Sequence, residues 1–130
     1  MNTPVNFSIA KLLKEKGFEQ KVRGRYTLTN WNIAFKIGEF FVSDYEINDS
    51  CIYAPIISEV VMWLYEKHVI WIVVNPHKGE DDLGKPFMEF DPEVWSFTNK
   101  CILHNTKLLY FNSPIEAYEA AIEYTLKNLL

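Results

Sequence analysis

The sequence predicts an α+β fold, with three helices packed on a mainly antiparallel sheet in the order α-βββ-α-βββ(β)-α. Two observations lead to this prediction. Three segments carry apolar residues at helical spacing, and the segments between them carry short runs of β-branched and aromatic residues bounded by turn residues. Because the strands come in groups between the helices, an antiparallel sheet is favoured over a parallel one. A chain of 130 residues is expected to form a single domain, residues 1–130.

The first helix is expected over Ser8–Lys16, where apolar residues recur at helical spacing. Gly17 follows at the position where a helix commonly ends in a left-handed residue. Phe18 is then expected to pack back on Leu13, as in a Schellman ending.

The second helix is expected over Pro55–His68, with Pro55 at the first helical position, where its missing N–H would have no partner. Its apolar arc is broader than a surface helix needs, so burial on more than one side is expected. The arc consists of Ile56, Ile57, Val60, Val61, Trp63 and Leu64.

The third helix is expected over Pro114–Leu129. Ser113 and Glu116 have the spacing of a capping box, and Pro114 suits the first helical position. Strands are expected between the helices, with turns at Asp91-Pro92 and Asn105-Thr106 and an acidic loop over 79–84. The expected strands are 26–28, 33–37, 40–42, 69–74, 86–90, 94–97, 101–104 and 108–111.

The strand over Val69–Val74, which Asn75-Pro76 is expected to close, is apolar at every position. Successive side chains of a strand point to opposite faces, so both faces of this strand are apolar. We therefore expect both sides to be covered by helices, by the rest of the sheet or by another molecule. The chain is also rich in aromatic residues, which are enriched at protein interfaces.

The charge pattern argues against general binding to a nucleic-acid backbone, because the net charge is −4. Residues 1–38 carry seven basic and two acidic side chains, however, and a weak nucleic-acid surface within 11–31 is kept as an alternative, with Lys21, Arg23 and Arg25 as its contacts. No stretch is long and apolar enough for a signal peptide or a membrane span, so a cytoplasmic protein without a membrane partner is expected.

No catalytic residues are predicted, so the chain is interpreted as a non-enzymatic protein. Cys101 and His104 have the spacing of half a zinc site, but the second half is missing, so no metal and no cofactor are expected. Cys51 and Cys101 are read as free thiols, and a disulfide framework is not expected.

Four residues are the candidates for binding a ligand or a partner: Trp31, Trp63, His68 and Trp71. The leading hypothesis is binding of another protein or of a second copy, giving a homodimer, since exposed apolar patches mark such sites. The alternative is a small hydrolase or ligand-binding protein with an aromatic pocket formed by these side chains.

Three stretches resemble small uncharacterised proteins encoded by phages and prophages of gut Bacteroidales. They are residues 9–18, residues 53–68 and residues 113–121. The resemblance covers about a third of the chain and implies a capped-helix scaffold around a small sheet. It implies an accessory protein of the cytoplasm and assigns no activity and no site residue.

Overall fold

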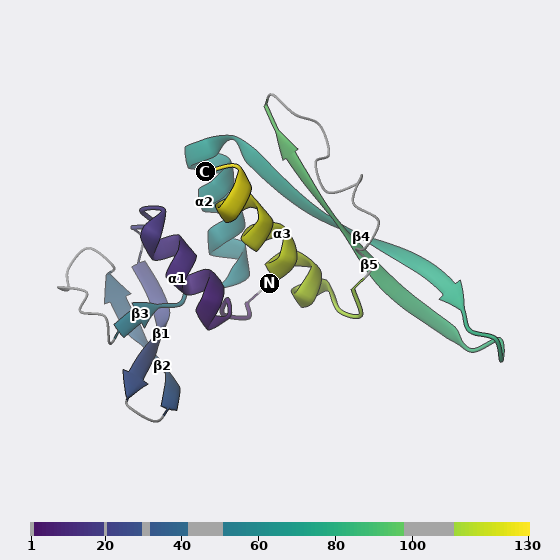
Figure 1. The fold of residues 1–130 in the computed structure, drawn as a ribbon, viewed down its shortest axis with the longest axis horizontal. Coiled ribbons are helices and arrows are strands. Elements are labelled where there is room, and N and C mark those ends of the chain that lie inside the picture. The colour runs from purple at the N-terminus through teal and green to yellow at the C-terminus, as the bar shows by residue number, and fades with distance from the viewer. Residues whose placement is uncertain (1, 20, 30–31, 42–50, 98–110) are drawn as a thin grey trace.

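The computed structural model describes residues 2–19, 21–29, 32–41, 51–97 and 111–130. The predicted α+β class is confirmed, because helices and antiparallel strands occupy separate stretches of the described chain (Figure 1). The strands form two antiparallel sheets, one in the order β2-β1-β3 and one made by β4 and β5. The elements are α1 (Phe7–Glu15), β1 (Lys21–Thr29), β2 (Asn32–Phe41), β3 (Cys51–Tyr53), α2 (Ile57–His68), β4 (Ile70–Glu80), β5 (Pro86–Ser96) and α3 (Pro114–Asn128).

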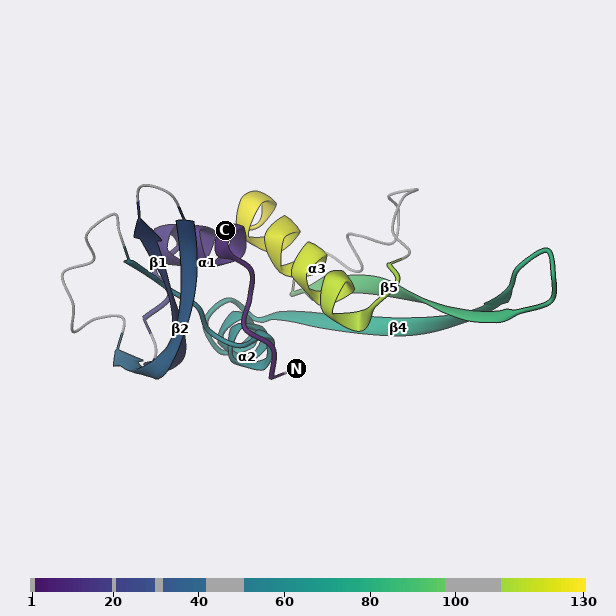
Figure 2. The same ribbon diagram turned by 90° about the horizontal axis from the view of Figure 1, so that it is seen from below.

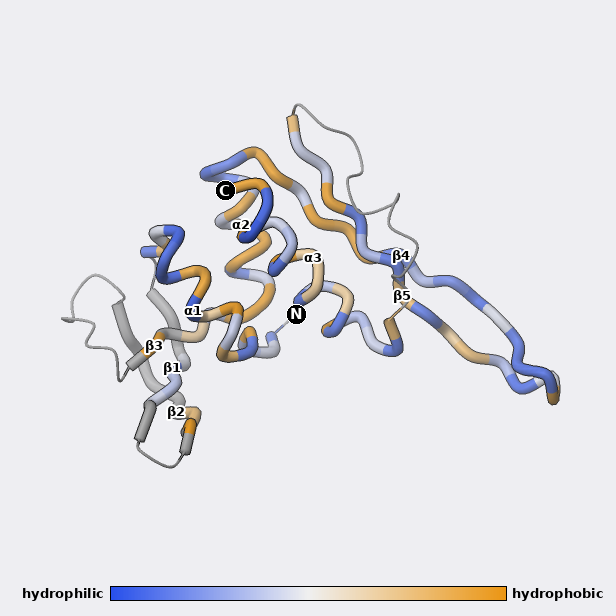
Figure 3. Tube along the Cα trace, in the orientation of Figure 1, coloured by the Kyte–Doolittle hydropathy of each residue, from blue (hydrophilic) through white to orange (hydrophobic). Residues whose placement is uncertain are grey.

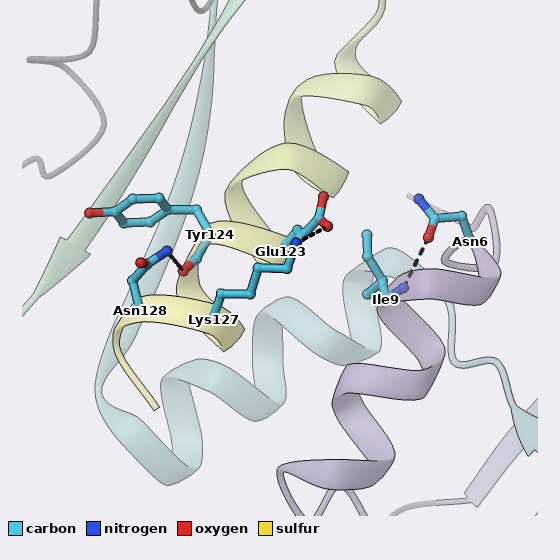
Figure 4. Close-up of polar contacts among 6 residues, drawn as sticks. All are labelled: Asn6, Ile9, Glu123, Tyr124, Lys127 and Asn128. Carbon is cyan, nitrogen blue, oxygen red and sulfur yellow. Dashed lines mark hydrogen bonds and ion pairs between the residues drawn. The ribbon is translucent and has the colours of Figure 1, made fainter.

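Helix α1 begins and ends at residues whose chemistry fixes its boundaries. The Asn6 side-chain oxygen accepts a hydrogen bond from the Ile9 N–H at 3.0 Å, as an N-cap does (Figure 4). At the other end Gly17 has φ +80°, and the Phe18 N–H donates to the Leu13 carbonyl at 3.0 Å. This is the hydrogen bond of a Schellman ending, so the ending predicted for this helix is confirmed.

Helix α2 begins two residues later than predicted. Pro55 and Ile56 lie before the helix, because the N-terminal segment pairs with them. The Val5 N–H donates to the Pro55 carbonyl at 2.9 Å, which keeps this stretch extended. The Glu59 carboxylate then accepts from the Ile56 N–H at 2.9 Å and satisfies one of the donors at the helix start.

Helix α3 begins as predicted, with Ser113 as N-cap and Pro114 at the start; the Ser113 hydroxyl oxygen accepts from the Glu116 N–H at 3.2 Å. Near its end an exposed ion pair joins Lys127 and Glu123 at 2.6 Å, and the Asn128 amide donates to the Tyr124 carbonyl (Figure 4).

Strands β4 and β5 form one long hairpin, and two turn predictions are wrong as a result. Asn75-Pro76 does not close β4, and Asp91-Pro92 lies inside β5. The register is continuous from Ile70 opposite Ser96 to Glu80 opposite Pro86. Two expected strands, 101–104 and 108–111, lie outside the described residues apart from Phe111, which forms an isolated bridge with Phe90. Asn105-Thr106 also lies outside them.

A single apolar core joins the helices to both sheets. Helix α3 packs against α1, α2 and the β4–β5 hairpin, and α1 and α2 lie beside it (Figures 1 and 2). Side chains from each helix and from β3, β4 and β5 are buried there: Ile9, Leu13, Ile52, Ile57, Leu64, Ile72, Val94, Ile122 and Leu126.

Tyr26 fastens the three-stranded sheet to the N-terminal segment. Its hydroxyl donates to the Val5 carbonyl at 2.7 Å, and its ring contacts Phe7 edge-on with 5.7 Å between centroids. Burial, and secondarily the negative charge of Glu119, raises the pKa of the Tyr26 hydroxyl. The folded protein therefore favours the neutral phenol.

Replacing Tyr26 with phenylalanine is expected to lower the free energy of unfolding by about 1 kcal/mol, because the Val5 carbonyl loses its hydrogen bond. The raised pKa means that Tyr26 stabilises the protein below the unfolded value, near pH 10, and that this contribution is lost as the pH rises through the folded pKa. Urea unfolding between pH 7 and 11 checks this. The wild type should lose stability more steeply above pH 10 than Tyr26→Phe, and parallel curves would contradict the assignment.

Candidate functional site

The β4–β5 hairpin forms an arm that projects from the helices. Each strand has 11 residues, so at about 3.3 Å per residue the ribbon is roughly 36 Å long. Both views show its distal half extending beyond the helical part (Figures 1 and 2). The base of the arm is apolar, whereas most of the distal half is hydrophilic (Figure 3). The arm therefore presents surfaces that the core does not require.

One face of the arm is buried at its base. Ile70 and Ile72 on β4 are 4% and 2% exposed, and Val94, opposite Ile72 on β5, is fully buried. The α2 and α3 helices pack on this part of the hairpin. The helices therefore cover one of the two faces that the apolar pattern of 69–74 predicts to be shielded from solvent.

The opposite face at the base is open among the described residues. Trp71 and Trp95 lie directly opposite each other in the ladder and are 43% and 39% exposed. The Tyr65 ring, from α2, meets Trp71 edge-on with 5.5 Å between centroids, and Val69 lies between them in sequence. We call Tyr65, Val69, Trp71 and Trp95 the tryptophan platform. Of the two covers expected for this strand, the described residues supply the one on the Ile72 face, and Trp71 and Trp95 stay exposed on the other.

Val69 holds an unusual backbone conformation within the platform. It ends α2 with φ +54°, and it is the only non-glycine residue with positive φ in the described chain. A β-branched residue is strained in this region, where helices normally place glycine or asparagine. Its side chain is also 54% exposed, so neither backbone geometry nor burial favours valine here. Strain of this kind is concentrated at functional sites.

Replacing Val69 with glycine is expected to raise the free energy of unfolding by about 0.5–1 kcal/mol. Relief of the left-handed strain outweighs the entropy that glycine loses on folding. Urea unfolding of the two proteins measures the difference. A less stable Val69→Gly variant would mean that the packing of the valine side chain exceeds its backbone strain.

Carboxylates continue the platform face along β5. The Trp95 indole N–H donates to the Glu93 carboxylate at 3.0 Å, which places both side chains on one face. Alternate residues of a strand share a face, so Asp91 and Glu89 follow them toward the tip. Asp91 pairs with His77 of β4 at 3.6 Å, and its side chain is only 13% exposed. Among the residues that the structure describes, Glu89 and Glu93 form no ion pair.

The backbone edges of the arm are interrupted by prolines. The Phe90 N–H and carbonyl bond with Phe111, each at 2.9 Å, so these groups point away from β4. In an antiparallel ladder, every second residue along the strand points its N–H and carbonyl the same way as Phe90, and so do the residues opposite them on the other strand. The backbone nitrogens of three prolines therefore point away from the partner strand, so the N–H that each lacks costs the hairpin no hydrogen bond. These are Pro76, which lies opposite Phe90, Pro86 and Pro92. Such edges resist pairing with a further strand, so contacts through side chains are favoured.

The tip of the arm is a turn organised by Asp81. Its carboxylate accepts from the N–H groups of Leu83 and Lys85 at 2.9 and 2.8 Å. Just below it the Phe87 ring covers Gly79, where an added Cβ would clash with the ring. An open depression of about 780 Å³ lies here, lined by Lys78, Gly79, Glu80, Pro86, Phe87 and Met88.

Of the residues predicted to form one aromatic pocket, the structure brings Trp63 and His68 together and places Trp71 on a different surface. Trp63 is 3% exposed and packs in the core, with its ring 5.3 Å from that of Phe18. His68 is exposed at the end of α2, and its ring lies 4.9 Å from that of Trp63. Trp71 belongs to the platform, and Trp31 lies outside the described residues. Trp71 is thus the one predicted binding residue that the structure places on the platform.

The residues predicted for other chemistry are spread over the molecule. Lys21, Arg23 and Arg25 lie in β1, and Arg25 is half-buried. Cys51 lies in β3, whereas Cys101 and His104 fall outside the described part. Within that part no three histidine, cysteine or carboxylate side chains come together as a metal site would require.

Comparison with known proteins adds no relative from which a role can be transferred. No protein-family model matches the chain, and no curated protein or solved structure is significantly similar to it. Among the described residues, no helix is long and apolar enough to cross a membrane.

Proposed function

We propose that this chain is a non-enzymatic accessory protein that binds another protein through the exposed face of the β4–β5 arm. The observation that carries the proposal is the pair Trp71 and Trp95, which remain 43% and 39% exposed although the other face of the same strands is buried. Tryptophan is the residue type most enriched among the side chains that dominate binding at protein interfaces.

The surroundings of the pair support a binding role. Tyr65 and Val69 extend the apolar surface, and Val69 lies there with a positive φ that strains a β-branched residue. The platform has carboxylates beside its rings and contains no nucleophile paired with a base, so it offers a surface for contact and not a site for a reaction. The cytoplasmic location and the phage or prophage setting stay predictions, the second resting on the resemblance of three segments.

Affinity purification from the native host tests the proposal. The wild type is compared with a Trp71→Ala/Trp95→Ala double variant, each as the full chain, and captured proteins are identified by mass spectrometry. We expect a partner that the wild type retains and the double variant loses, because a buried tryptophan commonly contributes at least about 2 kcal/mol to binding, or about thirtyfold in affinity.

A matched control is Ile33→Ala, which removes an apolar side chain that is 49% exposed on β2, in the other sheet. This variant should retain the partner. Capture of the same proteins by the wild type and by the double variant, with circular dichroism showing that both are folded, would contradict the proposal.

A further inference from the structure

The charge of the arm restricts which partner fits the platform. Residues 70–96 carry six acidic and two basic side chains, a net charge of −4 that equals the net charge of the whole chain. Glu89 and Glu93 lie on the platform face of β5 and are half-buried. A field of one sign along a projecting element attracts partners of the opposite sign and repels others.

The local geometry combines aromatic faces with a carboxylate. Trp95 and Glu93 are held together by the indole hydrogen bond of 3.0 Å, and Trp71 lies opposite Trp95. A carboxylate accepts up to about four hydrogen bonds, so the bond from Trp95 leaves Glu93 with further acceptor capacity. A guanidinium group can stack on an indole ring while its N–H groups donate to a carboxylate. The Trp95 ring and the Glu93 carboxylate lie side by side and offer both of these contacts.

A second copy of this chain is a poorer occupant for the same face. A symmetric dimer uses the same patch of both copies, so the carboxylates of Glu89 and Glu93 from both copies would lie in one interface. Like charges brought together in an interface oppose binding. Addition of a further strand along the arm is opposed by three prolines, because they lack the outward N–H groups that such a strand would bond. They are Pro76, Pro86 and Pro92.

We propose that the tryptophan platform, together with Glu89 and Glu93, receives the arginine or lysine side chains of a basic segment of a different protein. This inference rests on the proposed function and specifies the chemistry of the partner. The rings supply the apolar and cation–π contacts, and the two carboxylates supply charge-assisted hydrogen bonds.

Titration of the full chain with a short arginine homopeptide tests the inference, with a glycine–serine peptide of equal length as the negative probe. Tryptophan fluorescence and calorimetry report binding at low and at moderate salt. We expect the arginine peptide to bind and the neutral peptide not to bind. Replacement of both Trp71 and Trp95 by alanine should abolish the binding.

Two double variants that remove the same number of charges distinguish binding at the platform face from attraction to the net charge of the arm. Glu89→Gln/Glu93→Gln removes two negative charges from the face, and Glu80→Gln/Asp82→Asn removes two from the tip of the same arm. The first pair should weaken binding by about tenfold, and the second by less than about threefold. Equal weakening by the two pairs would overturn the inference, because it would show attraction to net charge alone.

Two further outcomes distinguish this inference from the proposed function. A native partner that is lost with Trp71→Ala/Trp95→Ala but retained with Glu89→Gln/Glu93→Gln would leave the proposed function standing and overturn the basic-segment inference. Light scattering that shows a dimer in the wild type and a monomer in the tryptophan double variant would also overturn it, since the occupant would then be a second copy.

Discussion

Replacement of Leu64 by alanine is expected to lower the free energy of unfolding by about 2–5 kcal/mol. Leu64 is fully buried on α2, in the core that joins the helices to both sheets. The substitution removes apolar contact area and leaves a cavity that the surrounding side chains fill only in part. Because small domains are stable by about 5–15 kcal/mol, the loss is a large share of the total.

Met62 provides the matched control, because it lies on the same helix and is 44% exposed. Met62→Ala should change the free energy of unfolding by about 0.5 kcal/mol or less. Guanidinium unfolding of the three proteins measures both effects, with unchanged denaturant slopes showing that the midpoints report stability. Equal losses at the two positions would mean that α2 does not bury the face assigned to it.

The helices follow from the sequence because their boundaries depend on local chemistry. Helix α1 ends at Gly17 and helix α3 begins at Ser113, and the hydrogen bonds at both ends join residues no more than five positions apart. The sequence pattern that predicts each boundary is therefore local. The predicted start of the second helix at Pro55 is two residues too early, because its neighbour Ile56 bridges Pro4, a contact between distant parts of the chain. The α+β class needs only the grouping of the strands and is predictable for the same reason.

The hairpin arm does not follow from local signals. Pro76 and Pro92 are turn residues by composition, yet a two-stranded ribbon has two open edges and tolerates proline wherever the N–H faces outward. No sequence pattern near Pro76 indicates that its strand lies at the edge of a sheet. The long strands, the projecting tip and the division into two sheets all depend on that fact.

The platform was half predictable. Trp71 is a candidate from the sequence, whereas Trp95, Tyr65, Val69 and Glu93 are not in the predicted site. Their placement depends on the register of the hairpin. Trp71 and Trp95 lie equally far from Leu83 along the chain, so a turn centred there pairs them. The Asp81 carboxylate, which accepts from two N–H groups of the turn, is the signal that identifies this centre.

Adjacent lysine substitutions on β4 should have very different effects on stability. Ile72→Lys is expected to lower the free energy of unfolding by about 4 kcal/mol or more, because a charge enters a face that is 2% exposed. Trp71→Lys places the same charge one residue away, on a face that is 43% exposed. It should cost about 1 kcal/mol, mainly through the lost ring contact with Tyr65.

The pH dependence of the two variants separates burial from loss of contacts. Burial at position 72 lowers the pKa of the introduced lysine, so its unfolded state binds more protons in the interval below the ordinary value of about 10.4. Stability of Ile72→Lys should therefore rise with pH through that interval relative to the wild type, while Trp71→Lys should run parallel to the wild type. Guanidinium unfolding at pH 6 to 10 measures this. Equal destabilisation of the two variants would show that the platform is covered in solution, and the face assigned to a partner would then belong to the protein's own core.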